Sequence, residues 1–124
     1  MTEYITIIEV LTMHKILIEG YGGSHGIRDM GALESALFRP QTGYYEDLIQ
    51  EAAALWESIS QNHPFIDGNK RSGAFAFIWF LKKNKVKGFK DINPSSLTAL
   101  TLLIAESNPK NKNQMIALIT QLLG

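Results

Sequence analysis

The feature that most limits how this chain can fold is an uninterrupted run of eight apolar residues from Ala74 to Leu81, with the sequence AFAFIWFL. A domain of 124 residues buries roughly two-thirds of the surface of its unfolded chain, and a run of this kind belongs to the buried part. Directly before it come the nine residues 63–71, HPFIDGNKR, which include an imidazole, a carboxylate, an amide and two cations. A chemically capable loop therefore leads straight into a core element.

The surroundings of the apolar run favour a helix over a buried strand. Asp67-Gly68 between apolar residues is also a hairpin-turn signal, but no alternating strand precedes it and the preceding segment has helical spacing up to about residue 62. The segment 69–84 is long for a strand, begins with Asn69 as a possible helix cap and ends with lysines. Because a helix that is apolar on all sides belongs at the centre of a bundle, we predict an all-α fold around this helix.

The remaining helices are predicted from caps and apolar spacing. Thr6 and Glu9 have capping-box spacing, Asp29 can cap a short helix, and Asn93-Pro94 is typical of a cap followed by proline at the first helical position. The six predicted helices extend from the Thr6 cap to about 19, from the Asp29 cap to about 38, and over about 45–62, 69–84, 94–107 and 111 or 113 to 123. We expect one domain, residues 1–124, built as a compact bundle.

Composition excludes several classes of protein. The chain has no cysteine, so disulfide frameworks and zinc-thiolate sites are excluded. It has no apolar run of membrane-spanning length, and its first ten residues carry two acids where a signal peptide needs positive charge. We therefore expect a soluble cytoplasmic protein with no membrane contact.

The net charge is zero, but residues 1–60 carry minus six and residues 61–124 carry plus six. This asymmetry suggests an electropositive face suited to an anionic ligand. Part of the positive charge follows the central helix and suits the negative end of its dipole: Lys82, Lys83, Lys85 and Lys87. These lysines lack arginines and interleaved aromatics, so direct binding of nucleic acid is not expected.

Given a helix that starts near Asn69, the loop before it can bind an anion. Gly68, Asn69 and Lys70 lie where free amides and the helix dipole favour negative charge, and Gly68 lets a phosphate approach the backbone. Lys70 and Arg71 add positive charge to the same place.

Two further side chains extend this chemistry. Asp67 supplies an oxygen ligand for magnesium, and His63 can accept a proton from a substrate hydroxyl. Together these groups suit phosphoryl or nucleotidyl transfer. In a purely structural alternative His63 closes a helix, Phe65 fills the core and Asp67-Gly68 makes a turn, which leaves the clustered polar groups without a role.

Other polar positions have simpler interpretations. His14 is expected to be a partly buried helix residue rather than a ligand, and His25 to be exposed. The glycines of segment 20–26 match neither the dinucleotide fingerprint nor the P-loop, and Glu57 is expected on a solvated helix face. Residues 39–43 are predicted to form a loop.

The HPFIDGNKR stretch resembles the signature of the Fic/Doc superfamily, which is usually His, any residue, Phe, any residue, Asp or Glu, Gly or Ala, Asn, any residue, Arg. Upstream, residues 14–40, HKILIEGYGGSHGIRDMGALESALFRP, look like the amino-terminal half of death-on-curing (Doc) toxins of toxin-antitoxin systems. The resemblance covers most of the chain and implies the helical fold of that family.

The resemblance also implies roles. It makes His63 the general base and Asp67 the magnesium ligand, with Phe65 as a core anchor of the loop, and it implies ATP and magnesium as cofactors. It assigns phosphate binding to the four residues that follow: Gly68, Asn69, Lys70 and Arg71.

Two positions favour the Doc branch. Fic enzymes that transfer AMP usually have a small residue where Lys70 stands and a second arginine where Ala74 stands. Doc-branch members act as kinases that phosphorylate a threonine of elongation factor Tu and halt translation. The alternatives are a Fic-type protein AMP transferase and a catalytically silent module that binds anions or peptides.

The resemblance implies two protein partners. One is a substrate like elongation factor Tu, which residues 39–45 would align as a flap, and the other is a Phd-like antitoxin. Self-inhibited Fic proteins carry Ser or Thr four residues before a Glu, but here Lys15 precedes Glu19-Gly20, so inhibition within the chain is not expected.

Overall fold

The computed structural model describes residues 1–107, which form five α-helices and one 3₁₀ helix. In chain order these are α1 (Ile7–Tyr21), α2 (Met30–Phe38), the 3₁₀ helix η1 (Arg39–Thr42), α3 (Leu48–Asn62), α4 (Asn69–Lys83) and α5 (Pro94–Ser107). The described residues contain one isolated β-bridge and no strand, so the predicted all-α fold is confirmed. The sixth predicted helix falls on residues after 107 and lies outside the described part.

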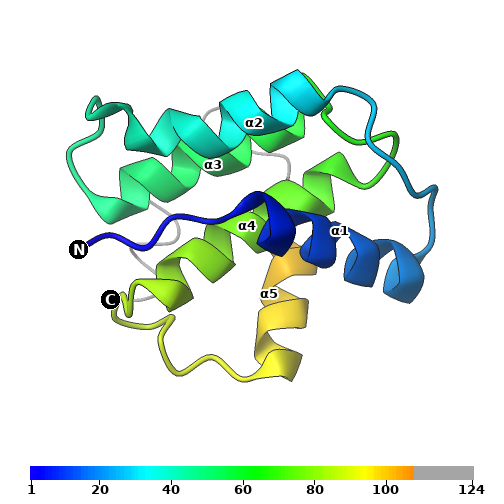
Figure 1. The fold of residues 1–124 in the computed structure, drawn as a ribbon. Coiled ribbons are helices and arrows are strands. Elements are labelled where there is room, and N and C mark those ends of the chain that lie inside the picture. The colour runs from blue at the N-terminus through cyan, green and yellow to red at the C-terminus, as the bar shows by residue number, and fades with distance from the viewer. Residues whose placement is uncertain (108–124) are drawn as a thin grey trace.

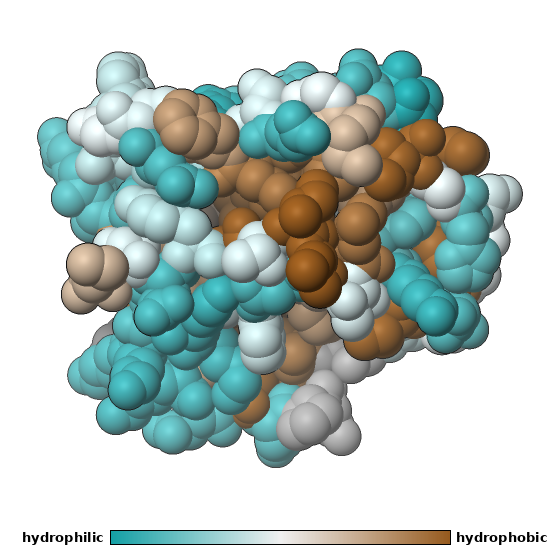
Figure 2. Space-filling view, viewed as in Figure 1, coloured by the Kyte–Doolittle hydropathy of each residue, from teal (hydrophilic) through white to brown (hydrophobic). Residues whose placement is uncertain are grey.

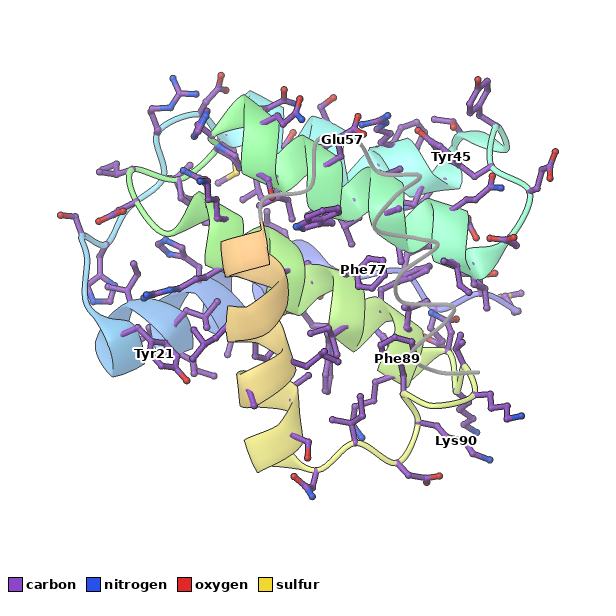
Figure 3. The ribbon with its side chains drawn as sticks, turned by 180° about the vertical axis from the view of Figure 1, so that it is seen from behind. Tyr21, Tyr45, Glu57, Phe77, Phe89 and Lys90 are labelled. Carbon is purple, nitrogen blue, oxygen red and sulfur yellow. The ribbon has the colours of Figure 1, made fainter. Side chains whose placement is uncertain are left out.

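Helix α4 lies at the centre of the bundle, as its apolar sequence predicts. It packs against α1, α3 and α5, and α1 and α5 lie on opposite sides of it (Figures 1 and 3). Helix α2 packs on α3 and forms an outer layer (Figure 1). Nine of the fifteen residues of α4 are buried, and four of its large apolar side chains are fully enclosed: Phe77, Ile78, Phe80 and Leu81.

Helices α3 and α4 approach each other closely at Gly73. A Cβ atom added there would lie 2.5 Å from Ser60 Oγ and 2.9 Å from the carbonyl oxygen of Trp56. Next to this contact the ring of Trp56 packs edge-on against Phe77, with 6.3 Å between ring centroids. Phe77 packs in the same way against Phe89 from the turn after α4, and Figure 3 shows these two side chains together in the interior. The core is therefore continuous from α3 through α4 to that turn.

The helix starts follow their caps. The Thr6–Glu9 capping box, the Asp29 cap of α2 and the Asn93 side chain that accepts the amide of Ser96 are present as predicted. Helix α3 begins at Leu48 rather than near residue 45, because the Asp47 side chain accepts the amide of Gln50 and acts as the cap.

On the face shown in Figure 2, apolar surface is open over the middle of the molecule, where α1 crosses α4 in Figure 1. Two exposed apolar side chains of α1 are eight residues apart and hence on one face of the helix: Ile8 and Ile16. In residues 1–107 we find no helix with the length and apolar character that crossing a membrane requires.

Glu9 joins the start of α1 to the far end of α4. Its carboxylate accepts hydrogen bonds from the Thr6 amide (3.1 Å), Trp79 Nε1 (2.8 Å) and Lys83 Nζ (2.6 Å). Burial alone raises the pKa of the Glu9 carboxyl, but the hydrogen bonds from Lys83, Trp79 and Thr6 outweigh it and lower the pKa to about 2.

Replacing Glu9 with Gln keeps a capping-box residue and removes the charge that faces Lys83. Because the pKa of Glu9 in the fold is about 2, below its ordinary value of 4.5, the carboxylate stabilises the fold above pH 4.5 and loses this contribution as the pH falls towards 2. We expect Glu9→Gln to lower the free energy of unfolding by about 1 kcal/mol at neutral pH, a figure that allows for solvent screening of a partly exposed pair.

Urea unfolding followed by circular dichroism measures this effect, with the exposed Glu3→Gln as the control. The difference between wild type and Glu9→Gln should shrink as the pH is lowered from 4.5 towards 2. A difference that stays constant over this range contradicts the role of the Glu9 charge.

Gly73→Ala tests the close approach of α3 and α4. Alanine is the better helix former by about 1 kcal/mol, but the added methyl group meets backbone, so we expect a net loss of about 1–3 kcal/mol in unfolding free energy. Gly20→Ala in α1 is the matched control, because a Cβ there meets nothing within 4 Å, and it should stabilise the protein by about 0.5–1 kcal/mol. Thermal unfolding of both variants decides the matter: equal gains would mean that the helices are not in close contact.

Candidate active site

A cleft of about 540 Å³ lies where the amino terminus of α4 meets the carboxyl end of α1. All six site residues predicted from the sequence line it: His63, Asp67, Gly68, Asn69, Lys70 and Arg71. The opposite wall comes from the last turns of α1 and the glycines after it: Leu17, Ile18, Tyr21, Gly22 and Gly23. Segments that are about fifty residues apart in the sequence thus form one cavity.

The loop between α3 and α4 turns sharply at both of its ends. His63 (φ 49°, ψ 56°) and Gly68 (φ 74°) both have left-handed backbone conformations. Glycine adopts this conformation readily, whereas a residue with a Cβ atom adopts it at a cost. The strained position in this loop is therefore His63.

Phe65 and Asn69 hold the middle of the loop. Phe65 is buried, as predicted, with 1% of its surface exposed. The Asn69 side chain accepts the amide of Phe65 (2.9 Å) and donates to the carbonyl of the same residue (3.0 Å). The prediction that Asn69 caps α4 is wrong: Gly68 is the cap residue, and the Asn69 amide instead binds the backbone of the loop.

The segment between α1 and α2 forms backbone hydrogen bonds with the loop between α3 and α4. The amide of Ile66 donates to the carbonyl of Gly26 at 3.1 Å, next to the isolated β-bridge. The amides of Arg28 and Asp29 both donate to the carbonyl of Pro64, at 2.7 and 3.0 Å. The backbone of the loop therefore finds partners in another part of the chain.

His14 of α1 supports the loop from beneath. Its ring stacks flat on the ring of Phe65, with centroids 3.8 Å apart and 5° between the planes. Its Nε2 atom lies 2.8 Å from the carbonyl oxygen of Asp67, and since a carbonyl only accepts, Nε2 donates this bond. His14 is a buried helix residue, in keeping with the prediction, and it also helps to shape the loop.

The Asp67 carboxylate is oriented by two backbone amides. Gly68 donates to Oδ1 at 2.9 Å, and Ser24 donates to Oδ2 at 3.1 Å. The chain passes so close at Gly23 that a Cβ there would lie 2.7 Å from Oδ2. Each carboxylate oxygen has two lone pairs, so each keeps one for another partner. The glycine segment is thus a wall that orients Asp67, although its spacing matches no phosphate-binding motif.

The cationic side of the cleft comes from the first turn of α4. No side chain caps this helix, so the amides of Asn69, Lys70 and Arg71 are the ones that its geometry leaves open. Lys70 is exposed. The Arg71 guanidinium lies over the ring of Tyr21, 5.1 Å from the ring centroid, and donates to the Tyr21 carbonyl at 3.5 Å. Positive charge and open amides therefore meet in one place.

Residues 4–81 match the model of the Fic/DOC family. The chain belongs to this family. It is 44% identical over 93 residues to the protein named Toxin Doc from Mycolicibacterium smegmatis (strain ATCC 700084 / mc(2)155). The aligned region covers 70% of this chain and 68% of that protein. It is also 32% identical over 94 residues to Protein kinase doc from Escherichia phage P1, over 73% of this chain and 75% of that protein. These relatives place the chain in the Doc toxin branch of the family.

The region matched to the Fic/DOC family includes both walls of the cleft and ends within α4. Among the described residues no group of three or more His, Cys, Asp and Glu side chains is placed to hold a metal ion. The Asp67 carboxylate alone fits a magnesium ion of the kind that has one protein carboxylate and fills its other positions with phosphate oxygens and water.

A second polar cluster holds the segment after α2, where a loop was predicted and η1 is found. Arg39 donates to the Tyr45 hydroxyl (2.6 Å), to Glu57 (3.1 Å) and to Ser58 Oγ (2.8 Å). Burial lowers the pKa of Arg39, but the hydrogen bonds to Tyr45 and Glu57 outweigh it and raise the pKa above its ordinary value. Glu57, predicted on a solvated helix face, keeps 29% of its side chain exposed and pairs with Arg39 at 3.1 Å. Figure 3 labels Glu57 and Tyr45, two of the residues that Arg39 binds.

Sequence reasoning missed the residues that support the loop from outside. Nothing in the local pattern marks His14, Arg28 or Ser24, because their partners are 35 to 53 residues away in the sequence. His14 and Arg28 bind backbone carbonyls of the loop, and the Ser24 amide binds the Asp67 carboxylate. The one signal was the cluster of glycines after α1, which indicates close backbone approach without showing what is approached.

Gly23→Ala and Gly22→Ala form a matched pair that tests the orientation of Asp67. Both glycines have positive φ, so both substitutions strain the backbone, but a Cβ at Gly22 meets nothing within 4 Å while one at Gly23 meets the Asp67 carboxylate. We expect Gly23→Ala to shift the Ser24 and Gly68 amide resonances far more than Gly22→Ala does. Equal shifts in a ¹H–¹⁵N spectrum would show that Asp67 does not rest against this segment.

Proposed function

We propose that this protein is a Doc-type toxin kinase that uses ATP and magnesium to phosphorylate a hydroxyl group, a threonine of a translation factor such as elongation factor Tu. The observation that carries the proposal is the cleft at the uncapped amino terminus of α4, which six chemically matched residues line together. The names of the two relatives, Toxin Doc and Protein kinase doc, support it.

The phosphates of ATP bind at the first turn of α4. The open amides of this turn and the positive end of the helix dipole attract an anion, and Lys70 and Arg71 neutralise more of its charge. Gly68 leaves room for a phosphate at the backbone. Phosphoryl transfer depends mainly on such positioning and charge neutralisation, so this turn provides the larger part of catalysis.

Asp67 is the metal ligand in this proposal. Its carboxylate is held by the amides of Ser24 and Gly68 and keeps a lone pair on each oxygen. Asp67 would hold a magnesium ion together with the phosphates of the nucleotide, and the ion would supply positive charge against the charge that develops on the transferred group.

His63 is the proposed general base. Its side chain is exposed and lines the cleft together with Asp67 and Lys70. Within the described part of the chain its imidazole has no hydrogen-bond partner, so a substrate hydroxyl can approach it. Removal of the hydroxyl proton by such a base contributes about 10²–10⁴-fold to a rate.

Two positions favour transfer of the terminal phosphate over transfer of AMP. Lys70 stands where AMP-transferring Fic enzymes have a small residue. Ala74 stands where they have a second arginine, and here it is fully buried and does not line the cleft. With one arginine fewer, the nucleotide can lie in another orientation and deliver its terminal phosphate.

Control of this activity is assigned to a separate Phd-like antitoxin. Lys15 occupies the position of the hydroxyl residue in the inhibitory motif of Fic proteins, so inhibition from within the chain is not proposed. Residues 39–45 are the proposed flap that aligns the protein substrate. A hydrogen bond from Arg39 to the Tyr45 hydroxyl joins the two ends of this segment.

Intact-mass analysis of elongation factor Tu, after incubation with this protein, ATP and magnesium, tests the proposal. We expect a gain of one phosphate, reduced at least about 100-fold in rate by His63→Ala because the base is lost. His25→Ala is the matched control, since this exposed histidine does not line the cleft, and it should act like the wild type.

Other outcomes assign the chain differently. An AMP-sized gain would show that Lys70 and Ala74 do not determine the chemistry and would favour a Fic-type AMP transferase. No gain on elongation factor Tu or on any protein of a whole lysate supplied with labelled ATP would favour a silent binding module.

A further inference from the structure

Three consecutive carbonyl groups at the carboxyl end of α3 find their partners in the segment between α1 and α2. Arg28 Nη2 donates to the carbonyl of Asn62 at 2.8 Å, and Arg28 Nε donates to the carbonyl of His63 at 2.6 Å. The next carbonyl, of Pro64, accepts the amides of Arg28 and Asp29. The last carbonyls of any helix lack partners within it, so this segment acts as a cap that comes from another part of the chain.

The residue at the centre of this cap is the proposed base. His63 has a left-handed backbone conformation, which is unfavourable for a residue with a Cβ atom and persists only where the surroundings impose it. The guanidinium of arginine is planar and presents its donors as a rigid fork, so two bonds from Arg28 constrain the peptide groups on both sides of His63 at once.

We propose that Arg28 is a positioning residue that sets the backbone conformation of His63 and hence the place of its imidazole in the cleft. The inference rests on the proposed function, in which His63 is the base. Arg28 does not line the cleft, so it acts through the backbone of His63 rather than on a substrate.

A purely structural cap would have a different effect. Arg28 is exposed, so its bonds contribute modestly to stability and its substitution should leave the fold intact. The proposed nucleotide site lies at the first turn of α4. Asp67, just before this turn, is held by His14 and Ser24 and not by Arg28. Loss of Arg28 should therefore reduce turnover without weakening the binding of ATP.

The test compares Arg28→Ala and Arg28→Lys with Asp47→Ala, which removes the cap at the opposite end of the same helix. Because a displacement of about 1 Å at a reacting group can cost about 100-fold in rate, we expect Arg28→Ala to lower kcat by about 10–100-fold with the KM for ATP unchanged. Lysine keeps one donor and should restore part of kcat, whereas Asp47→Ala should lower the melting temperature and keep kcat. An unchanged kcat in Arg28→Ala, or an equal loss in Asp47→Ala, overturns the proposal.

A second readout does not depend on activity and separates this proposal from the proposed function. The imidazole resonances of His63 should move or broaden in Arg28→Ala and stay in place in Asp47→Ala, while those of His25 stay in place in both. If the wild-type protein transfers no phosphate, the proposed function fails, but these resonances still decide whether Arg28 holds His63. Unmoved His63 resonances in Arg28→Ala overturn the proposal.

Discussion

Burial of most of α4 among α1, α3 and α5 is the interaction on which the rest of this structure depends. Helices α1, α3 and α5 cover most of α4 and leave Phe75 and Trp79 partly exposed, and the chemically capable loop stands at its amino-terminal end. The close contact at Gly73 brings α3 alongside, so the end of α3 and the start of α4 are joined by a short, strongly bent loop. The core thus determines where the cleft lies.

The loop itself is held in place by partners from several directions. Asn69 binds it from within, His14 and the buried Phe65 hold it from beneath, and the segment between α1 and α2 satisfies its outer carbonyls. Such a site has little freedom to reorganise, and preorganised dipoles are what stabilise a charged transition state. The strained backbone of His63 is understandable in this setting, because the surrounding contacts make up for its cost.

The sequence was sufficient for the five described α-helices and for one wall of the cleft, and it failed at contacts between distant segments. The apolar run and the caps at Thr6, Asp29 and Asn93 are local signals, and their predictions are confirmed. The six predicted residues of the cleft lie within nine positions, so local chemistry sufficed to group them, whereas the opposite wall from the end of α1 was not predicted.

The failures have a common physical origin. Asn69 was predicted as a cap because an asparagine at a helix start usually caps it, but the backbone of Phe65 competes successfully for its side chain. Glu57 was predicted on a solvated helix face, and nothing in the sequence indicated that folding would place Arg39 beside it. The support that His14 and Arg28 give to the loop likewise exists only once α1 and the segment after it have packed against the loop.

The most direct test of the account is a crystal structure of the protein with magnesium and a non-hydrolysable analogue of ATP. The account predicts phosphate groups on the amides of the first turn of α4, between Lys70 and Arg71, with the metal ion on the Asp67 carboxylate and His63 facing the terminal phosphate. A nucleotide bound away from this turn, or a cleft that stays empty at saturating analogue, would contradict it.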